Sequence, residues 1–472
     1  MRVHEFPIDG PLDPLRAHLA LRGAGPAVLL DGVADAGPLA RRAFVLFEPV
    51  DVLAVGPGSD GRAGDDPFAR LFRRLDAFRA ATATPAARGT FRAGAAGLFA
   101  YDAGRHLERL PATAAASTRV PDAWFGLFHQ GLEIDVATGR GTLFVAETRE
   151  RDRCGAGYVD GVVRRARAAL ASPPPVPPAP APVAALASNF DRAAYLDAVA
   201  SVRASILEGD VYQVNLSQRF AAAFPGDPVA LYARLRALNP APFAALVETG
   251  DAAVLSSSPE RFLSVEAGLV ETRPIKGTRR RTGDPEHDAR ARADLASAEK
   301  DAAELAMIVD LQRNDLGRVA AYGSVEVVDP GALEEYATVL HRVAIVRARL
   351  AAGRTTEELL RATFPGGSIT GAPKIAAMEV IESLEKVRRG IFTGSIGWIG
   401  VDGDLDLNIA IRTLVVEGGE AHFHVGGGIV LDSDPAEEYQ ETLTKGRALA
   451  AALGADLPEE APRARRAPGL LD

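Results

Sequence analysis

Three short strand patterns and a helix pattern close the chain: IFTGSIGWIGV (391–401), LDLNIAIRTLVV (405–416), AHFHVGGGIV (421–430) and PAEEYQETLTKGRALAAAL (435–453). Asp- and Gly-rich turns separate the strand patterns, as expected for antiparallel hairpins. Strands joined in this way and interrupted by helices favour an α+β fold over a doubly wound parallel sheet. Apolar residues at helical spacing continue through Pro435–Leu453, which predicts a closing helix.

The rest of the chain shows the same mixture of helices and strands. Helices are expected over Arg70–Ala81, Gly161–Ala171, Asp191–Gly209, Ser297–Arg313, Thr355–Thr363 and Lys374–Leu384, and strands over Ala43–Phe47, Leu143–Val145, Val211–Phe220 and Ala253–Val265. Proline-rich Ser172–Pro182 has polyproline II character and can neither pair in a sheet nor continue a helix. It predicts an N-terminal subdomain (1–171), a linker (172–188), a second domain (189–455) and a flexible tail (456–472).

Composition excludes several classes of protein. The formal net charge of -9 argues against a nucleic-acid binder, because phosphate affinity needs a basic surface. No apolar run reaches about 18 residues and the start lacks a signal-peptide core, so we expect no membrane span. The single cysteine, Cys154, allows no intramolecular disulfide, which fits a cytoplasmic protein.

Lysine is rare, which draws attention to the few positions that keep it. Of 53 Lys and Arg residues, only five are lysine: Lys276, Lys300, Lys374, Lys386 and Lys445. Lys276 lies between an apolar residue and a glycine in Pro274–Thr278. A buried lysine loses its proton readily and can attack an electrophilic carbon. Glu260, sixteen residues earlier, could protonate a leaving hydroxyl. An ordinary loop lysine and a salt-bridged glutamate are the alternative reading.

Two predicted helices each carry a pair of carboxylates at i and i+3, which places each pair on one helix face. The pairs are Asp301 with Glu304 and Glu438 with Glu441. Two such helices could enclose a hard divalent cation, and ligation by oxygen alone favours Mg²⁺. Solvated helix surfaces are the alternative for either pair alone. Val425–Ser433, just before the second pair, reads as a bare backbone loop whose N–H groups could face an anion.

The turn Phe364–Lys374 is glycine-rich but is not a phosphate loop, because Ala372 and Pro373 separate its last glycine from the lysine. No dinucleotide fingerprint occurs, so neither ATP nor NAD is predicted. The hydroxyls of Ser368 and Thr370 and the exposed N–H groups of this turn suit a carboxylate ligand.

Together these motifs resemble the chorismate-utilising enzymes. The resemblance rests on Gly209–Phe220, Ser258–Phe262, Pro274–Thr278, Asp310–Arg318, Ser368–Lys374 and Gly426–Ser433, and more weakly on Gly97–Arg105. It covers the chain in order from about residue 190 to 450. It implies two interleaved subdomains whose antiparallel sheets pack as a β-sandwich core with helices outside.

The resemblance also implies roles for individual residues. Asp301, Glu304, Glu438 and Glu441 would hold Mg²⁺, with Asp301 in place of a usual Glu and so a shortened ligand. His341 falls on the active-site histidine of the family and Lys445 near the acidic cluster. The substrate would meet Gln213, Ser368, Thr370, Arg412, Gly426, Gly427, Gly428 and Lys445, while Lys276, Glu260 and His341 would be catalytic.

Two positions separate the subfamilies. Family members that make 4-amino-4-deoxychorismate, for p-aminobenzoate and folate synthesis, carry Lys at the position of Lys276, where those that make anthranilate carry Ala. Isochorismate and salicylate synthases carry a lysine base at the position of Gln213. Glutamine cannot deprotonate water, so the nucleophile should be ammonia. Cys154 lies in no nucleophile motif, so the resemblance implies a separate glutamine amidotransferase subunit.

Anthranilate synthesis and a non-catalytic chorismate-binding subunit remain as alternatives. In some relatives the N-terminal part holds tryptophan, and its marker is Leu-Leu-x-Ser. Here Leu29-Leu30-Asp31-Gly32 lacks the serine, so tryptophan binding is not predicted.

Overall fold

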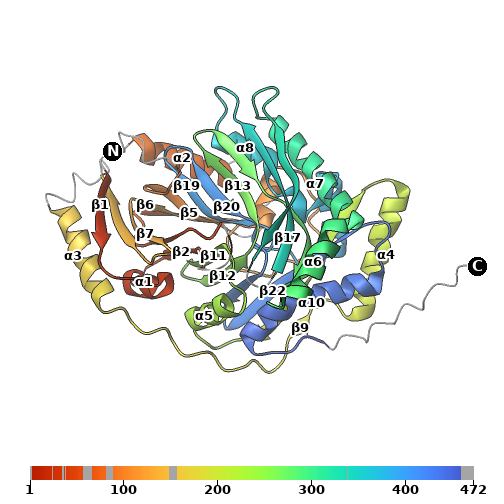
Figure 1. Cartoon of the computed structure of the whole chain (residues 1–472), viewed down its shortest axis with the longest axis horizontal. Helices are drawn as coiled ribbons and strands as arrows, with labels where there is room; N and C mark the ends of the chain where they lie inside the picture. Colours follow the sequence, from red (N-terminus) through yellow and green to blue (C-terminus); the bar gives the residue numbers. More distant parts are fainter. Residues whose placement is uncertain are drawn as a thin grey trace, which may run out of the picture.

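Two antiparallel sheets form the centre of the computed structural model, and helices cover their outer faces (Figure 1). The structure describes residues 3–23, 25–33, 37, 39–56, 66–80, 89–147, 157–336 and 339–458. Cys154 and most of the expected C-terminal tail lie outside these residues. None of the helices in the described part of the chain is long and apolar enough to cross a bilayer.

The first sheet, sheet A, runs in the order β1-β8-β7-β3-β2-β11-β12-β21-β22-β10-β18, with β9 also paired to β10. Its strands are β1 (Val3–Ile8), β2 (Ala27–Asp31), β3 (Arg42–Leu46), β7 (Gln130–Asp135), β8 (Gly141–Ala146), β9 (Ala187–Ser188), β10 (Gln213–Ala223), β11 (Phe243–Glu248), β12 (Ala252–Ser258), β18 (Gly371–Ala372), β21 (Thr413–Glu417) and β22 (Glu420–Ile429).

The second sheet, sheet B, runs in the order β15-β17-β14-β13-β20-β19-β5-β6-β4, with β16 also paired to β17. Its strands are β4 (Asp51–Val55), β5 (Gly94–Phe99), β6 (Ala123–Phe128), β13 (Arg261–Glu266), β14 (Leu269–Thr272), β15 (Ile275–Arg280), β16 (Glu326–Glu335), β17 (Val339–Arg349), β19 (Ser395–Gly400) and β20 (Leu405–Asn408).

Ten α-helices and two short 3₁₀ helices are seen in the described part of the chain. They are α1 (Pro14–Leu21), α2 (Pro67–Ala80), η1 (Tyr101–His106), α3 (Tyr158–Ala171), α4 (Arg192–Glu208), α5 (Pro228–Leu238), α6 (Pro285–Ser297), α7 (Glu299–Gly317), α8 (Thr356–Thr363), η3 (Gly367–Ile369), α9 (Lys374–Leu384) and α10 (Pro435–Leu453). Asp or Thr side chains cap the N-termini of α4, α8 and α10, as their sequences predict.

Apolar side chains from both sheets meet in one buried layer, which confirms the expected α+β sandwich. Phe44 and Val254 of sheet A pack in the same cluster as Trp124 and Trp398 of sheet B. A second cluster joins the outer face of sheet A to α4, α5, α9 and α10, and a third joins sheet B to α2, α7 and α8. Burial of these faces supplies the main stabilisation of the fold.

Strands from both ends of the chain are neighbours in each sheet. Leu29 of β2 pairs with Leu246 of β11, and Gly97 of β5 pairs with Gly397 of β19. The proline-rich segment runs along the outside of the molecule from α3 to β9, at the bottom of Figure 1. The linker therefore divides the sequence into two stretches, but both stretches contribute strands to both sheets.

Two expected single strands are each split between the sheets. The predicted strand Ala253–Val265 is β12 of sheet A followed by β13 of sheet B, and the predicted strand Leu405–Val416 is β20 of sheet B followed by β21 of sheet A. The chain crosses between the sheets at Glu260 and again just before Thr413. The apolar runs were recognised correctly, but a run of apolar residues carries no signal that its two halves belong to different layers.

Candidate active site

Glu260 lies where the chain leaves sheet A for sheet B. Its backbone is fixed there, because the N–H of Ile409 donates to the Glu260 carbonyl (2.9 Å) and the Ser258 hydroxyl donates to the Ile409 carbonyl (2.6 Å). The Glu260 carboxyl is buried and accepts a 2.7 Å hydrogen bond from the Ser368 hydroxyl. Burial raises the pKa of Glu260 to about 7, although the Ser368 bond and the nearby Lys276 charge lower it. Near neutral pH this carboxyl can therefore hold a proton and donate it.

Lys276 lies on a bulge of β15 that turns it out of regular pairing. The register of β15 against β17 shifts at Lys276 and Gly277, and Gly277 has φ +89°. A Cβ at Gly277 would lie 2.8 Å from Asp301 Oδ2, so glycine is needed for both conformation and space. Burial lowers the pKa of Lys276, and the Glu304 carboxylate opposes this most strongly. The bulge thus places a partly desolvated amine beside the predicted acidic cluster.

His341 and Arg412 approach the same space from sheet B and from the second crossing between the sheets. Thr278 Oγ1 and His341 Nδ1 are 2.8 Å apart. Burial and, to a smaller extent, the Arg412 charge lower the pKa of His341 to about 4, so the imidazole is neutral at pH 7. Arg412 has φ +54° and donates to the carbonyl of Lys445. Burial lowers the pKa of Arg412 to about 10, opposed by Glu441, so it stays cationic and can face an anion.

The first turns of α10 hold one carboxylate pair together. Glu438 is buried and accepts a 2.7 Å hydrogen bond from Ser433. Glu441 pairs with Lys445 (2.6 Å), which also donates to the carbonyl of Gly426 (2.9 Å). The Lys445 charge is the main cause that lowers the pKa of Glu441, whereas burial raises the pKa of Glu438. Figure 1 shows α10 beside β22. A Cβ at Gly427 of β22 would lie 3.2 Å from a Glu438 carboxylate oxygen and 3.5 Å from one of Glu441, so this pair faces β22.

The two carboxylates of the second pair, Asp301 and Glu304, lie in different environments. Burial raises the pKa of Glu304, and Lys276 and Lys300 oppose that rise, while Glu441 contributes like-charge repulsion. Asp301 instead pairs with Arg279 (3.1 Å). Glu304, Glu438 and Glu441 therefore act on one another or on the same lysines, and Asp301 also acts on Glu304 although it is paired with Arg279.

These carboxylates suit a hard cation in chemistry but are not gathered around one point. Within the part of the chain that the structure describes, no three His, Cys, Asp or Glu side chains lie close enough together to hold a metal ion. Burial and neighbouring negative charge disfavour the ionised forms of Glu304 and Glu438, a cost that a bound cation would relieve. The oxygen-only donor set fits Mg²⁺.

The expected glycine loop is instead part of a strand. Gly426 and Gly428 lie in β22, opposite Ser217 and Asn215 of β10. The N–H groups of Ser217 and Asn215 bond elsewhere, to Glu385 and Thr370. These two pairs are therefore non-hydrogen-bonded pairs, so Gly426 and Gly428 direct their N–H groups away from β10. The strand expected over Ala421–Val430 is confirmed, whereas the loop expected over Val425–Ser433 is wrong for Gly426–Gly428. The edge of the strand still presents the N–H groups of alternate residues.

Gln213 is fully buried at the start of β10. A Cβ on Gly428 would lie 2.2 Å from Gln213 Nε2, so the amide lies directly over the glycine backbone. Neither polar atom of the Gln213 side chain has a hydrogen-bond partner. A buried amide without partners is costly, which favours a polar ligand at this position.

The turn between α8 and α9 uses its hydroxyls within the protein. Ser368 donates to Glu260, and the Thr370 hydroxyl donates to the Gly366 carbonyl (3.1 Å). Lys374 closes the turn, because its ammonium donates to the Thr363 carbonyl (2.9 Å) and pairs with Asp315 of α7. The turn thus holds the Glu260 carboxyl and, through Ser368, lowers its pKa against the rise that burial causes.

Three contributors were not expected from the sequence. Lys300 acts on the carboxylates of both helices, and its i, i+4 spacing to Glu304 could have indicated this. Thr278, the partner of His341, and the Lys374–Asp315 pair link positions far apart in the chain, and no local pattern marks such contacts.

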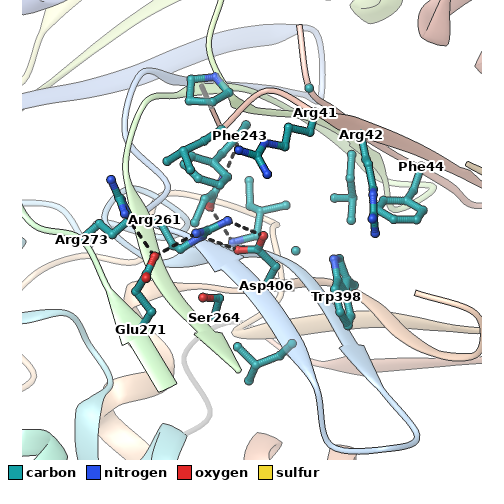
Figure 2. A pocket seen from close by; sticks show the side chains of 18 of the residues that line it. Arg41, Arg42, Phe44, Phe243, Arg261, Ser264, Glu271, Arg273, Trp398 and Asp406 are labelled. Carbon is teal, nitrogen blue, oxygen red and sulfur yellow. Dashed lines mark hydrogen bonds and ion pairs between the residues drawn. The ribbon is translucent and has the colours of Figure 1, made fainter. Parts of the chain in front are cut away.

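A separate cavity of about 590 Å³ lies between the two sheets, and none of the predicted site residues lines it (Figure 2). Its charges are already paired: Figure 2 shows Arg261 between Asp406 and Glu271. Burial raises the pKa of Glu271, but the surrounding arginines outweigh this and lower it overall. Gly32 lines the cavity, and a Cβ there would lie 2.7 Å from the Arg42 carbonyl oxygen. A serine would not fit at residue 32 without a backbone shift.

Comparison with known proteins places the chain among enzymes of one kind. The family model described as chorismate binding enzyme matches residues 34–451. Aminodeoxychorismate synthase component 1 of Klebsiella aerogenes is 44% identical over 355 residues, 75% of this chain and 76% of that protein. Anthranilate synthase component 1 of Streptomyces coelicolor is 37% identical over 466 residues, 96% of this chain and 88% of that protein.

Solved structures agree on the fold. Anthranilate synthase component I from Streptococcus pneumoniae superimposes with a TM-score of 0.76 at 30% identity, over 93% of this chain and 97% of that one. The menaquinone-specific isochorismate synthase from Escherichia coli superimposes with a TM-score of 0.72 at 19% identity, over 96% of this chain and 94% of that one.

Proposed function

Because the chain belongs to the chorismate binding enzyme family, we propose that it is component I of an aminodeoxychorismate synthase, which converts chorismate and ammonia to 4-amino-4-deoxychorismate. The observation that carries this proposal is the proximity of Lys276 to Glu260, each of which shifts the pKa of the other. The Lys276 amine is buried, which lowers its pKa, and it lies close enough to the buried Glu260 carboxyl to interact with it electrostatically. The pKa of Glu260 is about 7. Together these two side chains offer a nucleophile and a proton donor to the same substrate molecule.

The reaction divides into two displacements. The neutral amine of Lys276 bonds to ring C2 while both conjugated ring double bonds shift and the C4 hydroxyl leaves as water, taking the proton of Glu260. Ammonia then bonds to C4, both double bonds shift back, and Lys276 leaves C2. Glu260 regains its proton from the added nitrogen, so the net change is exchange of hydroxyl for amine with release of water. Cationic Arg412 and the N–H groups of Gly426 and Gly428 suit the substrate carboxylates.

Mg²⁺ is the proposed cofactor, and Glu304, Glu438 and Glu441 would hold it, with Asp301 at most contributing through water. When bound, the ion would neutralise a substrate carboxylate and orient the ring. Gln213 suits ammonia, because its two partnerless amide atoms can accept and donate hydrogen bonds. Neutral His341 can exchange hydrogen bonds with the substrate but carries no charge at pH 7. Ammonia would come from a separate glutamine amidotransferase subunit.

Anthranilate synthesis is the second candidate, because the Streptomyces coelicolor relative matches nearly the whole chain. Two residues weigh against it. Lys276 stands where anthranilate synthases carry alanine. Phe392 stands where they carry a tyrosine, and here it stacks on His424 with ring centroids 5.3 Å apart.

Mass spectrometry of the products formed from chorismate, ammonium and Mg²⁺ tests the proposal. We expect 4-amino-4-deoxychorismate, and anthranilate as the product would overturn it. Lys276→Ala should reduce product formation to background, while Lys386→Ala, which changes an exposed lysine, should leave it intact. Unchanged formation by Lys276→Ala, with no chorismate-derived adduct on Lys276 in the unmodified protein, would reject the covalent step.

A further inference from the structure

Four exposed apolar side chains gather at the outer end of the strands that enter the site. They are Leu207, Tyr212, Ile375 and Leu431, here called the Tyr212 patch, and Leu207 and Tyr212 are 73% and 67% exposed. Each comes from a different segment: α4, the residue before β10, the start of α9 and the segment after β22. Exposed apolar groups that gather in this way mark interaction surfaces more often than single exposed side chains do.

Backbone contacts bring the four segments together. The N–H of Tyr212 donates to the Ala372 carbonyl (2.7 Å), three residues before Ile375. The pairing of β10 with β22 ends with Val214 opposite Ile429, and Tyr212 and Leu431 each lie two residues beyond this last pair.

The fourth member joins through α4. Arg203 Nε donates to the Leu431 carbonyl (3.0 Å), and Leu207 lies one helical turn after Arg203 on the same face. Leu207 therefore lies on the face of α4 that is turned toward Leu431.

The same segments lead directly inward to the site. Gln213 follows Tyr212 and is fully buried with two partnerless amide atoms. The turn that carries Ser368 ends at the strand that pairs with Gln213, and Gly428 lies just before Leu431 in the chain. A molecule bound to the Tyr212 patch would thus lie at the surface end of the same segments that, one residue further inward, position Gln213.

The charge around the patch favours one kind of occupant. Exposed carboxylates border it, at Glu208, Asp210, Asp432 and Asp434. In a symmetric contact between two copies of the chain, these carboxylates would face the same carboxylates of the other copy. That arrangement is unfavourable, because like charges repel. A different protein with an apolar face bordered by basic residues would complement both the patch and its rim.

We propose that the Tyr212 patch docks the amidotransferase chain that supplies ammonia, a proposal that rests on the proposed function. Tyrosine and neighbouring leucines at the centre of a contact, with charges at the rim, match the usual anatomy of a protein interface. Docking here would release ammonia at the end of the molecule nearest to Gln213.

The test uses the full chain reconstituted with the amidotransferase subunit from the same organism. Leu207→Asp and Tyr212→Asp change the patch, and Tyr322→Asp is the matched control, because Tyr322 is fully exposed on the loop after α7. Product is measured with glutamine and, separately, with ammonium, and the dissociation constant of the complex is measured by sedimentation.

We expect both patch variants to raise the dissociation constant at least tenfold and to lower the glutamine-dependent rate to match. Their ammonium-dependent rate should stay within twofold, and the control should change neither rate. Unaltered binding by both patch variants would overturn the docking proposal. Failure of the unmodified chain to use ammonium would overturn the proposed function instead, and the binding measurement would still decide the docking site.

Discussion

Removal of the Ser368 hydroxyl should shift the alkaline limb of the pH–rate profile. This hydroxyl donates a 2.7 Å hydrogen bond to Glu260, and that bond lowers a pKa that burial has raised to about 7. A hydrogen bond to a charged group contributes about 1.5–3 kcal/mol, and about 1.4 kcal/mol corresponds to one pH unit. Ser368→Ala should therefore raise the pKa of Glu260 by about one to two pH units.

The sign follows from the role of Glu260 as proton donor. Activity is lost as pH rises through its pKa, so a higher pKa extends activity to higher pH. The rate of Ser368→Ala relative to the unmodified chain should rise about five- to tenfold between about pH 6 and pH 8. The ratio is the quantity to measure, because the pH dependence of free ammonia is common to both proteins and cancels.

The assay is the initial rate of product formation with ammonium, measured by mass spectrometry at each pH. Ser368→Thr, which keeps a hydroxyl, should follow the unmodified profile. A ratio for Ser368→Ala that stays flat across this range would show that Glu260 is not the proton donor, or that Ser368 does not control its pKa.

Other consequences can be measured directly. Gly427→Ala would place a methyl 3.2 Å from a Glu438 carboxylate oxygen and should raise the Mg²⁺ concentration needed for half-maximal rate several-fold. Gly161→Ala on α3 is the control and should not change that concentration. If Gly427→Ala and the unmodified chain needed the same Mg²⁺ concentration, these carboxylates would not be part of the metal site. Lys374→Met leaves a buried carboxylate unpaired and should lower the free energy of unfolding by about 3–5 kcal/mol in urea titrations, and less when combined with Asp315→Leu. The pKa of Glu271 is lowered in the folded state, so its stabilising contribution is full above about pH 4.3 and is lost as pH falls toward the folded value. The stability gap between the unmodified chain and Glu271→Gln should therefore narrow below about pH 4.3, and a gap independent of pH would contradict this assignment.

Helices and their carboxylate pairs could be predicted from the sequence because their signals are local. The i, i+3 spacing within α7 and α10 put Glu304 and Glu438 on the correct elements. The helix starts expected at Asp191 and Pro435 lie within one residue of the observed starts of α4 and α10. The helix expected from Ser297 starts two residues later, after a break at Ala298.

The layer of each strand depends on distant partners and could not be predicted. Pro259 marks an interruption in Ala253–Val265, because proline cannot donate to a strand ladder. The run gives no sign that the strand beyond it joins the other sheet, although this passage is what buries the Glu260 carboxyl. The hairpin of β16 and β17, which carries His341, was missed for the same reason. Gly426–Gly428 fell within both an expected strand, 421–430, and an expected loop, 425–433, because glycine has low strand propensity, and pairing with β10 decides in favour of the strand.

The pairing of β5 with β19 affects how the protein folds while the ribosome is still making it. These neighbours are about 300 residues apart in the chain, so at 5–20 residues per second the ribosome releases the second strand roughly 15–60 s after the first. Until then the nascent N-terminal strands carry open edges and uncovered apolar faces, a state prone to aggregation. Slower growth, lower temperature or added chaperones should therefore raise the yield of folded protein, and a chain stopped before Ser395 should collect in the insoluble fraction.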